Sequence, residues 1–128
     1  MYGSSKAASL YNKVSNLETN RLQQIVMLYD GAIKFLRLAA TDIEAKDINA
    51  KAEHIDRALD ILNYLQSILD YQHGAEVAQT LDIFYTTIMT MVLKASLQLD
   101  AGQVRRAADL LVPVCEAWAI NAAALPAK

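Results

Sequence analysis

The sequence predicts an all-α protein: an antiparallel up-down four-helix bundle with a short N-terminal arm or helix. Three observations support this prediction. Apolar residues recur at helical spacing through four long segments, and only short polar corners separate them, which favours antiparallel neighbours. The one stretch rich in Thr, Ile, Val and Tyr, residues 83–97, is too long and too continuous for a strand. A length of 128 residues suits a single domain with one core.

The first predicted helix, residues 22–43, has apolar side chains on two opposite faces. The stripe expected to face the core comprises Leu22, Ile25, Val26, Tyr29, Ile33, Leu36, Ala40 and Ile43. The opposite arc carries Met27, Leu28, Phe35 and Leu38, with Gly31 leaving a gap among them. Gly inside a helix costs about 1 kcal/mol relative to Ala, and the usual reason for it is close approach of another segment. Either a neighbouring helix of the same chain or a partner fills that gap.

The two ends of the chain are expected to lie outside the bundle proper. Residues 1–19 are interpreted as a partly ordered N-terminal arm, residues 20–122 as the bundle, and residues 123–128 as a frayed tail. Apolar anchors with helix-like spacing, able to dock as a short turn on an apolar surface, include Leu10, Tyr11 and Val14. Asn20 is predicted to cap the first helix, with Gln23 three residues later resembling a capping box.

The second and third helices are separated by a glycine stop. Asp47 is the expected cap of the second helix, residues 48–71, and Gly74 is expected to close it in the left-handed conformation. The third helix is placed at residues 75–99.

The fourth helix follows a corner at residues 100–102 and begins at about residue 103, with a kink expected near Pro113. Among the residues expected to face the core on the last three helices are Leu69, Val77, Leu81 and Trp118.

The composition argues against two classes of partner. Hydrophobic residues make up 54% of the chain, above the ~45–50% usual for a soluble domain, so an exposed apolar groove or an oligomer contact is expected. Asp82 and Lys94 bracket an apolar stretch shorter than the ~20 residues of a membrane span, so no membrane contact is expected. Twelve basic and fourteen acidic residues give a net charge of −2, which provides no electrostatic footprint for nucleic acid.

Reactive side chains are few and scattered. The lone Cys115 cannot form an internal disulfide and the N-terminus has no signal-peptide pattern, so a reduced, cytoplasmic protein is expected. Di-iron bundles carry Glu followed three residues later by His, and that spacing is absent from the sequence. His54 and His73 are interpreted as surface or capping residues, and Cys115 as a small buried hydrophobe. No catalytic residue, metal site or cofactor is predicted, and an enzyme is not expected.

Several segments of the chain resemble one known family. The run from Met27 to Leu36, MLYDGAIKFL, is similar to the signature of the flagellin-specific export chaperones, the FliS family. Further similar segments follow in the same order, among them residues 55–58, 74–78 and 116–118. The resemblance covers the chain from about Tyr11 to Trp118, and the segments agree in both residue type and spacing.

The resemblance implies a function as well as a fold. It implies a cytoplasmic bundle that binds the disordered C-terminal segment of flagellin, prevents premature polymerisation and keeps the subunit competent for flagellar type III secretion. It also implies contact with the flagellar export gate, and an arm, here Leu10, Tyr11 and Val14, that covers part of the groove when flagellin is absent.

Together with the second apolar face of the first helix, the resemblance predicts a set of partner-binding residues. These are Met27, Leu28, Gly31, Lys34, Phe35 and Leu38. A competing hypothesis is a self-associating structural bundle whose second apolar faces meet in a homodimer. The oligomeric state expected from the sequence is a monomer or a weak homodimer.

Overall fold

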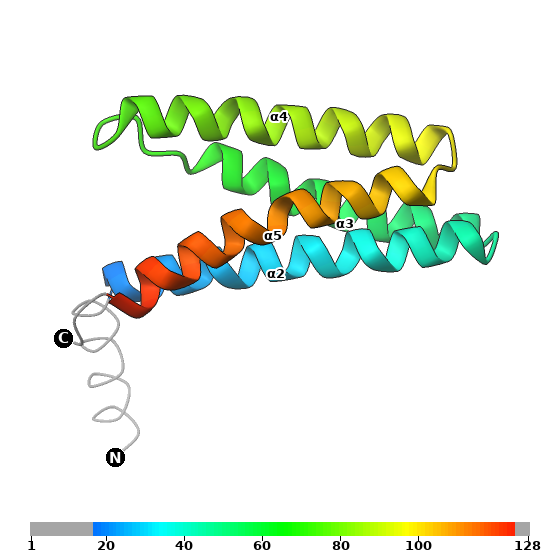
Figure 1. The fold of residues 1–128 in the computed structure, drawn as a ribbon, viewed down its shortest axis with the longest axis horizontal. Coiled ribbons are helices and arrows are strands. Elements are labelled where there is room, and N and C mark those ends of the chain that lie inside the picture. The colour runs from blue at the N-terminus through cyan, green and yellow to red at the C-terminus, as the bar shows by residue number, and fades with distance from the viewer. Residues whose placement is uncertain (1–16, 125–128) are drawn as a thin grey trace, which may run out of the picture.

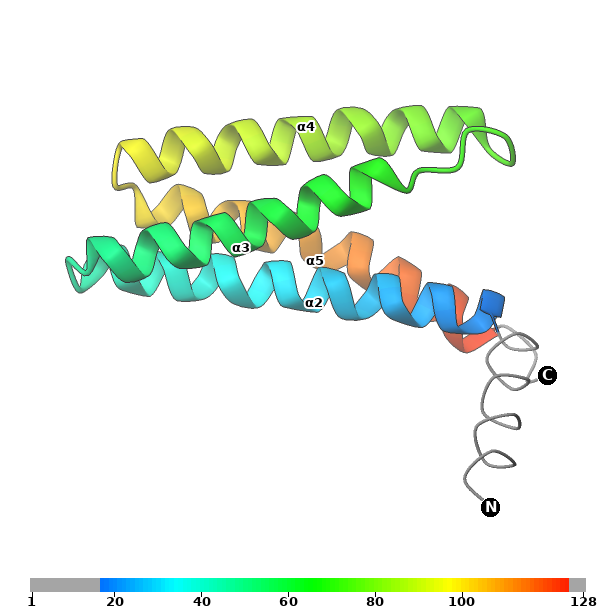
Figure 2. The ribbon, with the colours of Figure 1, turned by 180° about the vertical axis from the view of Figure 1, so that it is seen from behind.

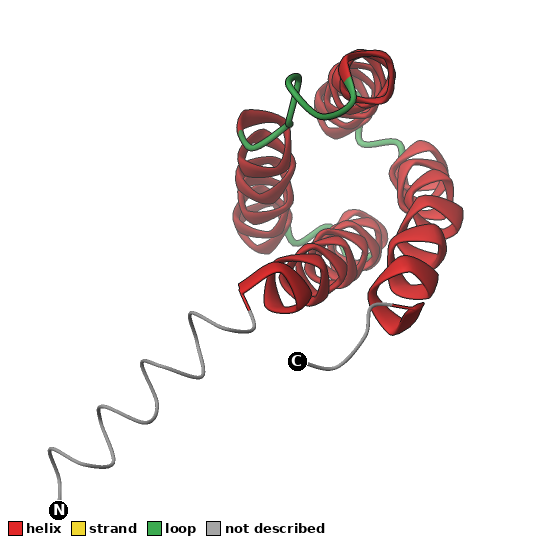
Figure 3. Cartoon of the chain, turned by 90° about the vertical axis from the view of Figure 1, so that its left-hand side faces the viewer, coloured by secondary structure: helices red, strands yellow, loops and turns green. Residues whose placement is uncertain are grey.

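The computed structural model describes residues 17–124, and this part of the chain forms four helices and no strand. Helix α2 spans Leu17–Glu44, α3 spans Ile48–Ser67, α4 spans Ala75–Leu97 and α5 spans Ala101–Ala124. Consecutive helices run in opposite directions (Figure 1). Seen end on, α2 lies beside both α3 and α5, and α4 lies across from α2 (Figure 3). The predicted all-α antiparallel bundle is confirmed.

The corner between α2 and α3 shows why the chain reverses there. Lys46 takes the left-handed conformation with φ of 60°, and the backbone N–H of Asp47 donates to the Asp42 carbonyl at 2.9 Å. This hydrogen bond satisfies a carbonyl group in the last turn of α2, as in a Schellman motif. The Asp47 carboxylate then accepts from the Ala50 N–H at 3.1 Å, which confirms the predicted cap of the next helix.

The corner between α4 and α5 repeats this arrangement one helix pair later. Leu99 has φ of 54°, and the Asp100 N–H donates to the Ala95 carbonyl at 2.9 Å. Asp100 accepts in turn from the Gln103 N–H at 3.1 Å, so a left-handed residue followed by a capping aspartate makes both tight corners. The following helix α5 continues through Pro113.

Three boundary predictions are wrong. Asn20 lies inside α2 and does not cap it, because α2 already includes Leu17 and Glu18, which are good helix formers. Gly74 is not left-handed: its φ of 170° is extended, and it precedes α4 as its N-cap. The second helix was predicted to reach residue 71, but α3 ends at Ser67, and the chain beyond it turns on hydrogen bonds to the Asp70 side chain.

The core runs along the axis of the bundle and draws on every helix. Its largest fully buried side chains are Tyr29, Leu36, Leu62, Leu65, Tyr85, Ile88, Val92, Val104 and Leu111. In the predicted core stripe of α2, the middle residues are buried and those near the two ends of the helix are half-buried. No helix within residues 17–124 combines the length and apolar character of a membrane span.

Candidate functional site

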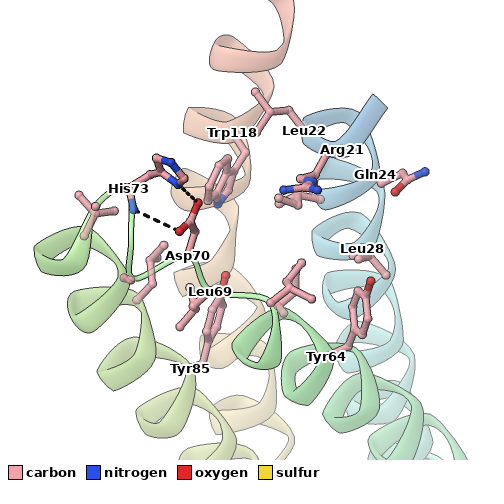
Figure 4. Close-up of a pocket in the computed structure, with 17 residues that line it drawn as sticks. Arg21, Leu22, Gln24, Leu28, Tyr64, Leu69, Asp70, His73, Tyr85 and Trp118 are labelled. Atoms are coloured by element: carbon pink, nitrogen blue, oxygen red, sulfur yellow. Dashed lines mark hydrogen bonds and ion pairs between the residues drawn. The ribbon is translucent and has the colours of Figure 1, made fainter. Parts of the chain in front are cut away.

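A cavity of about 1000 Å³, here called the bundle-end cavity, opens at the end of the bundle where α2 begins and α5 finishes. All four helices contribute to its walls, and Figure 4 shows their side chains converging on it. Its apolar lining comprises Leu22, Ile25, Leu28, Leu65, Ile68, Leu69, Val77, Ala78, Leu81 and Trp118. Arg21, Gln24, Asp70 and His73 add polar groups.

The cavity exists because the helices do not close at this end. Residues 68–74 connect α3 to α4, a longer link than the three-residue corners at the opposite end. Figures 1 and 2 show α5 passing away from α4 toward its C-terminal end, where it lies beside the start of α2. Side chains that would meet a neighbour in a closed bundle therefore face an opening.

The longer link is held by Asp70. Its carboxylate accepts from the backbone N–H groups of Gln72 at 3.0 Å and His73 at 3.1 Å, and from the His73 ring at 2.8 Å. Both hydrogen bonds from His73 lower the pKa of the Asp70 carboxyl group. The bond from the ring has the larger effect and the bond from the backbone the smaller. Figure 4 shows this pair at the rim beside Trp118.

A buried pair of tyrosines lies beneath the cavity. Tyr85 lines it, and its hydroxyl meets that of Tyr29 at 2.6 Å, with both residues at most 1% exposed. Burial raises the pKa of both hydroxyls, so both stay neutral at physiological pH. The cavity floor therefore offers apolar surface and an uncharged hydroxyl.

Of the six predicted partner-binding residues, only Leu28 lines the bundle-end cavity. Met27, Lys34 and Leu38 lie on the outer side of α2, where Met27 is 71% exposed and Leu38 is 36% exposed. Phe35 is half-buried and stacks on His54 of α3, with ring centroids 5.9 Å apart. The predicted set is therefore divided between a cavity wall, an outer face and a contact with α3.

Gly31 faces α3. A Cβ atom placed on it would lie 3.2 Å from Cδ1 of Ile61. Of the two alternatives for the gap at this glycine, the structure favours the neighbouring helix of the same chain. The predicted arm residues Leu10, Tyr11 and Val14 lie outside the described residues.

The sequence assigned several cavity residues to the core. Leu69, Leu81 and Trp118 pack against the core as predicted and also line the bundle-end cavity, whereas Val77 is 64% exposed at the cavity wall. The signal that could have marked Leu69, Val77 and Leu81 is their closeness to the long connection between α3 and α4; Trp118 on α5 has no such signal. Periodicity alone shows on which face of its helix a residue lies. It does not show whether a neighbouring helix packs against that residue.

Within residues 21–122, the ion pairs join titratable side chains two at a time. His54 lies 2.6 Å from Asp42, and Cys115 is 7% exposed with its thiol donating to Asp30 at 3.4 Å. Burial raises the pKa of Cys115 to about 11, as befits the small buried hydrophobe predicted for it. Within the described residues, no three His, Cys, Asp or Glu side chains are grouped so as to hold a metal ion.

The sequence of this chain is similar to those of known flagellar proteins. A family model described as flagellar protein FliS matches residues 3–124. The flagellar secretion chaperone FliS of Salmonella typhimurium is 36% identical over 97 residues, which is 75% of this chain and 72% of that protein. The FliS proteins of Campylobacter jejuni, 30% identical over 73% of each chain, and Vibrio cholerae, 28% identical over 88% of this chain and 82% of the relative, bear the same description.

Proposed function

This chain belongs to the FliS family of flagellar proteins, and on that premise we propose that it is a secretion chaperone for flagellin. It binds the disordered C-terminal segment of flagellin, prevents premature polymerisation and keeps the subunit competent for flagellar type III secretion. The observation that supports this function most directly is the bundle-end cavity, a large apolar opening to which all four helices contribute.

The chemistry of the cavity fits such a partner. A segment that packs as helices in the filament exposes an apolar stripe while it is unassembled, and that stripe needs cover. Each large apolar side chain that moves from water into the cavity contributes about 1.5–3 kcal/mol to the free energy of binding. The loss of conformational entropy when the segment becomes ordered opposes this gain. Several anchors are therefore needed, and the cavity walls offer Leu28, Leu69 and Trp118 among others.

The outer face of α2 extends the proposed binding surface. Met27 and Leu38 present exposed apolar side chains, and Lys34 lies on the same face. Gly31 and Phe35 support this surface indirectly, because their contacts with α3 hold α3 close to α2. A disordered segment that orders on binding can continue from the cavity along this face, because it has no fixed shape of its own.

The N-terminal arm covers the cavity when flagellin is absent. Arg21 and Leu22, in the first turns of α2, line the cavity, so the described part of the chain begins close to its opening. The apolar residues of this arm, Leu10, Tyr11 and Val14, are the ones proposed to lie on the apolar walls. The arm and the flagellin segment then compete for the same surface.

The remaining parts of the proposal follow from the same role. The protein acts in the cytoplasm, without a cofactor and without catalysis, and delivers its cargo to the flagellar export gate. The alternative, a homodimer that buries the outer face of α2, draws on the exposure of Met27. Sedimentation of the free protein separates the two: concentration-dependent dimerisation that Met27→Asp abolishes would favour the alternative.

The test is calorimetric titration with a peptide of the last forty or so residues of the host's flagellin, on the order of a two-helix segment. We expect one-to-one binding with a negative heat-capacity change, because apolar surface is buried. Ile68→Asn removes an apolar side chain from the cavity wall, and about tenfold weaker binding is expected.

Ile48→Asn is the matched control. Ile48 is 47% exposed at the start of α3 and Ile68 is 40% exposed at its other end, so the two changes are alike except for the cavity. Ile48→Asn should bind the peptide as the unchanged protein does. Equal weakening by both variants, or no binding by the unchanged protein, would contradict the proposed function.

A further inference from the structure

A second hollow lies beside the bundle-end cavity. This α4–α5 groove has a volume of about 500 Å³. Helix α4 supplies Glu76 and Thr80 to it, and α5 supplies Val114, Ala117 and Asn121. The groove forms where α5 passes away from α4 toward its C-terminal end (Figures 1 and 2).

Three side chains line both hollows: Val77, Leu81 and Trp118. Val77 is 64% exposed and Trp118 is half-buried, so the shared wall reaches the surface and ends there. Figure 4 shows Trp118 at the rim of the bundle-end cavity, across from the residues of α2. The two hollows are thus neighbours on one continuous surface, divided by an apolar ridge.

We propose that the bundle-end cavity and the α4–α5 groove form a single two-chambered cleft, and that the flagellin segment crosses the Trp118 ridge with an apolar side chain in each chamber. This inference rests on the proposed function and extends it from one cavity to a defined path over α4 and α5. The α4–α5 groove takes no residue from α2, so this part of the path is distinct from the outer face of α2.

The charge of the groove limits what can enter it. Glu76 is its only charged lining residue, and within residues 21–122 no cationic side chain lies within ion-pair distance of that carboxylate. An acidic side chain in the groove would meet like charge, whereas a basic one would gain a partner. Beside Glu76, a basic residue of the segment is therefore favoured over an acidic one.

The test fills the groove and leaves the cavity open. Ala117 is exposed and lines only the groove, so Ala117→Arg puts a long side chain, attracted to Glu76, across it. Ala119 is exposed on the same helix and lines neither hollow, so Ala119→Arg makes the same change in charge and is the matched control. Thr80→Arg, paired with Gln79→Arg, repeats the comparison from the opposite wall.

Binding of the flagellin peptide is measured by calorimetry and by the emission of Trp118, the only tryptophan in the chain. Ala117→Arg and Thr80→Arg should each raise Kd about tenfold, while their controls stay within about twofold of the unchanged protein. If the unchanged protein binds the peptide and the two groove variants bind equally well, the flagellin segment stays out of the groove and the inference is overturned. If the unchanged protein does not bind, the proposed function fails and the inference falls with it.

Discussion

The buried tyrosine pair gives a sharp test of how the floor of the cavity is held. Tyr85→Phe removes one hydroxyl and leaves that of Tyr29 buried without its 2.6 Å partner, with the Trp118 side chain as a remaining, weaker contact. An unsatisfied buried hydroxyl costs about 1–3 kcal/mol, whereas replacing both partners with apolar rings of the same shape is nearly neutral. Tyr85→Phe should therefore lower Tm by about 4–12 °C, at about 4 °C per kcal/mol for a domain of this size. The double variant with Tyr29→Phe should recover most of that loss.

Urea and thermal unfolding of the two single variants and the double variant form a double-mutant cycle that measures the coupling. The pH dependence adds a second readout. Burial raises the folded-state pKa of both tyrosines above the ordinary 10.0, so the unfolded chain loses these protons first. This linkage leaves stability unchanged well below pH 10, and stability falls as the pH rises through 10 toward the raised pKa values of the folded state. A double variant less stable than either single, with an unchanged alkaline slope, would refute the reasoning.

Two further predictions concern α2 and the arm that precedes it. Gly31→Ala should stabilise the protein by up to about 1 kcal/mol in urea unfolding, because the helix gains propensity and the half-buried end of Ile61 can shift by a few tenths of an ångström; a loss of stability would show that this contact cannot relax. Deleting residues 1–16 should lower Kd for the flagellin peptide several-fold, about what removal of a weak intramolecular competitor gives, and an unchanged or higher Kd would exclude the arm as a cover.

The helix faces could be predicted well from the sequence. Leu36, Leu62, Val92 and Leu111 repeat at helical spacing with their neighbours and prove fully buried, one from each helix. The Asp47 cap was equally predictable, because an aspartate side chain at a helix start has a local donor within three residues. Signals of this kind depend on residues close together in the chain, so a single sequence contains them.

Turn conformations were less predictable. Gly74 looks like a left-handed stop, but the left-handed positions belong to Lys46 and Leu99, which glycine-based rules pass over. Their strain is tolerated because each precedes an aspartate that caps the following helix, and the packed helices fix both corners. The choice between these positions depends on where the helices must reverse, which is a tertiary property.

By itself the sequence determined the four helices of residues 17–124, most of their inward faces and, through the run from Met27 to Leu36, the family. Only the tertiary structure decided that Gly31 is met by Ile61 and that Trp118 lines a cavity. Periodicity specifies the direction of a side chain relative to its own helix axis. Whether another helix arrives in that direction depends on how all four diverge along their length, and no single segment of the sequence records that divergence.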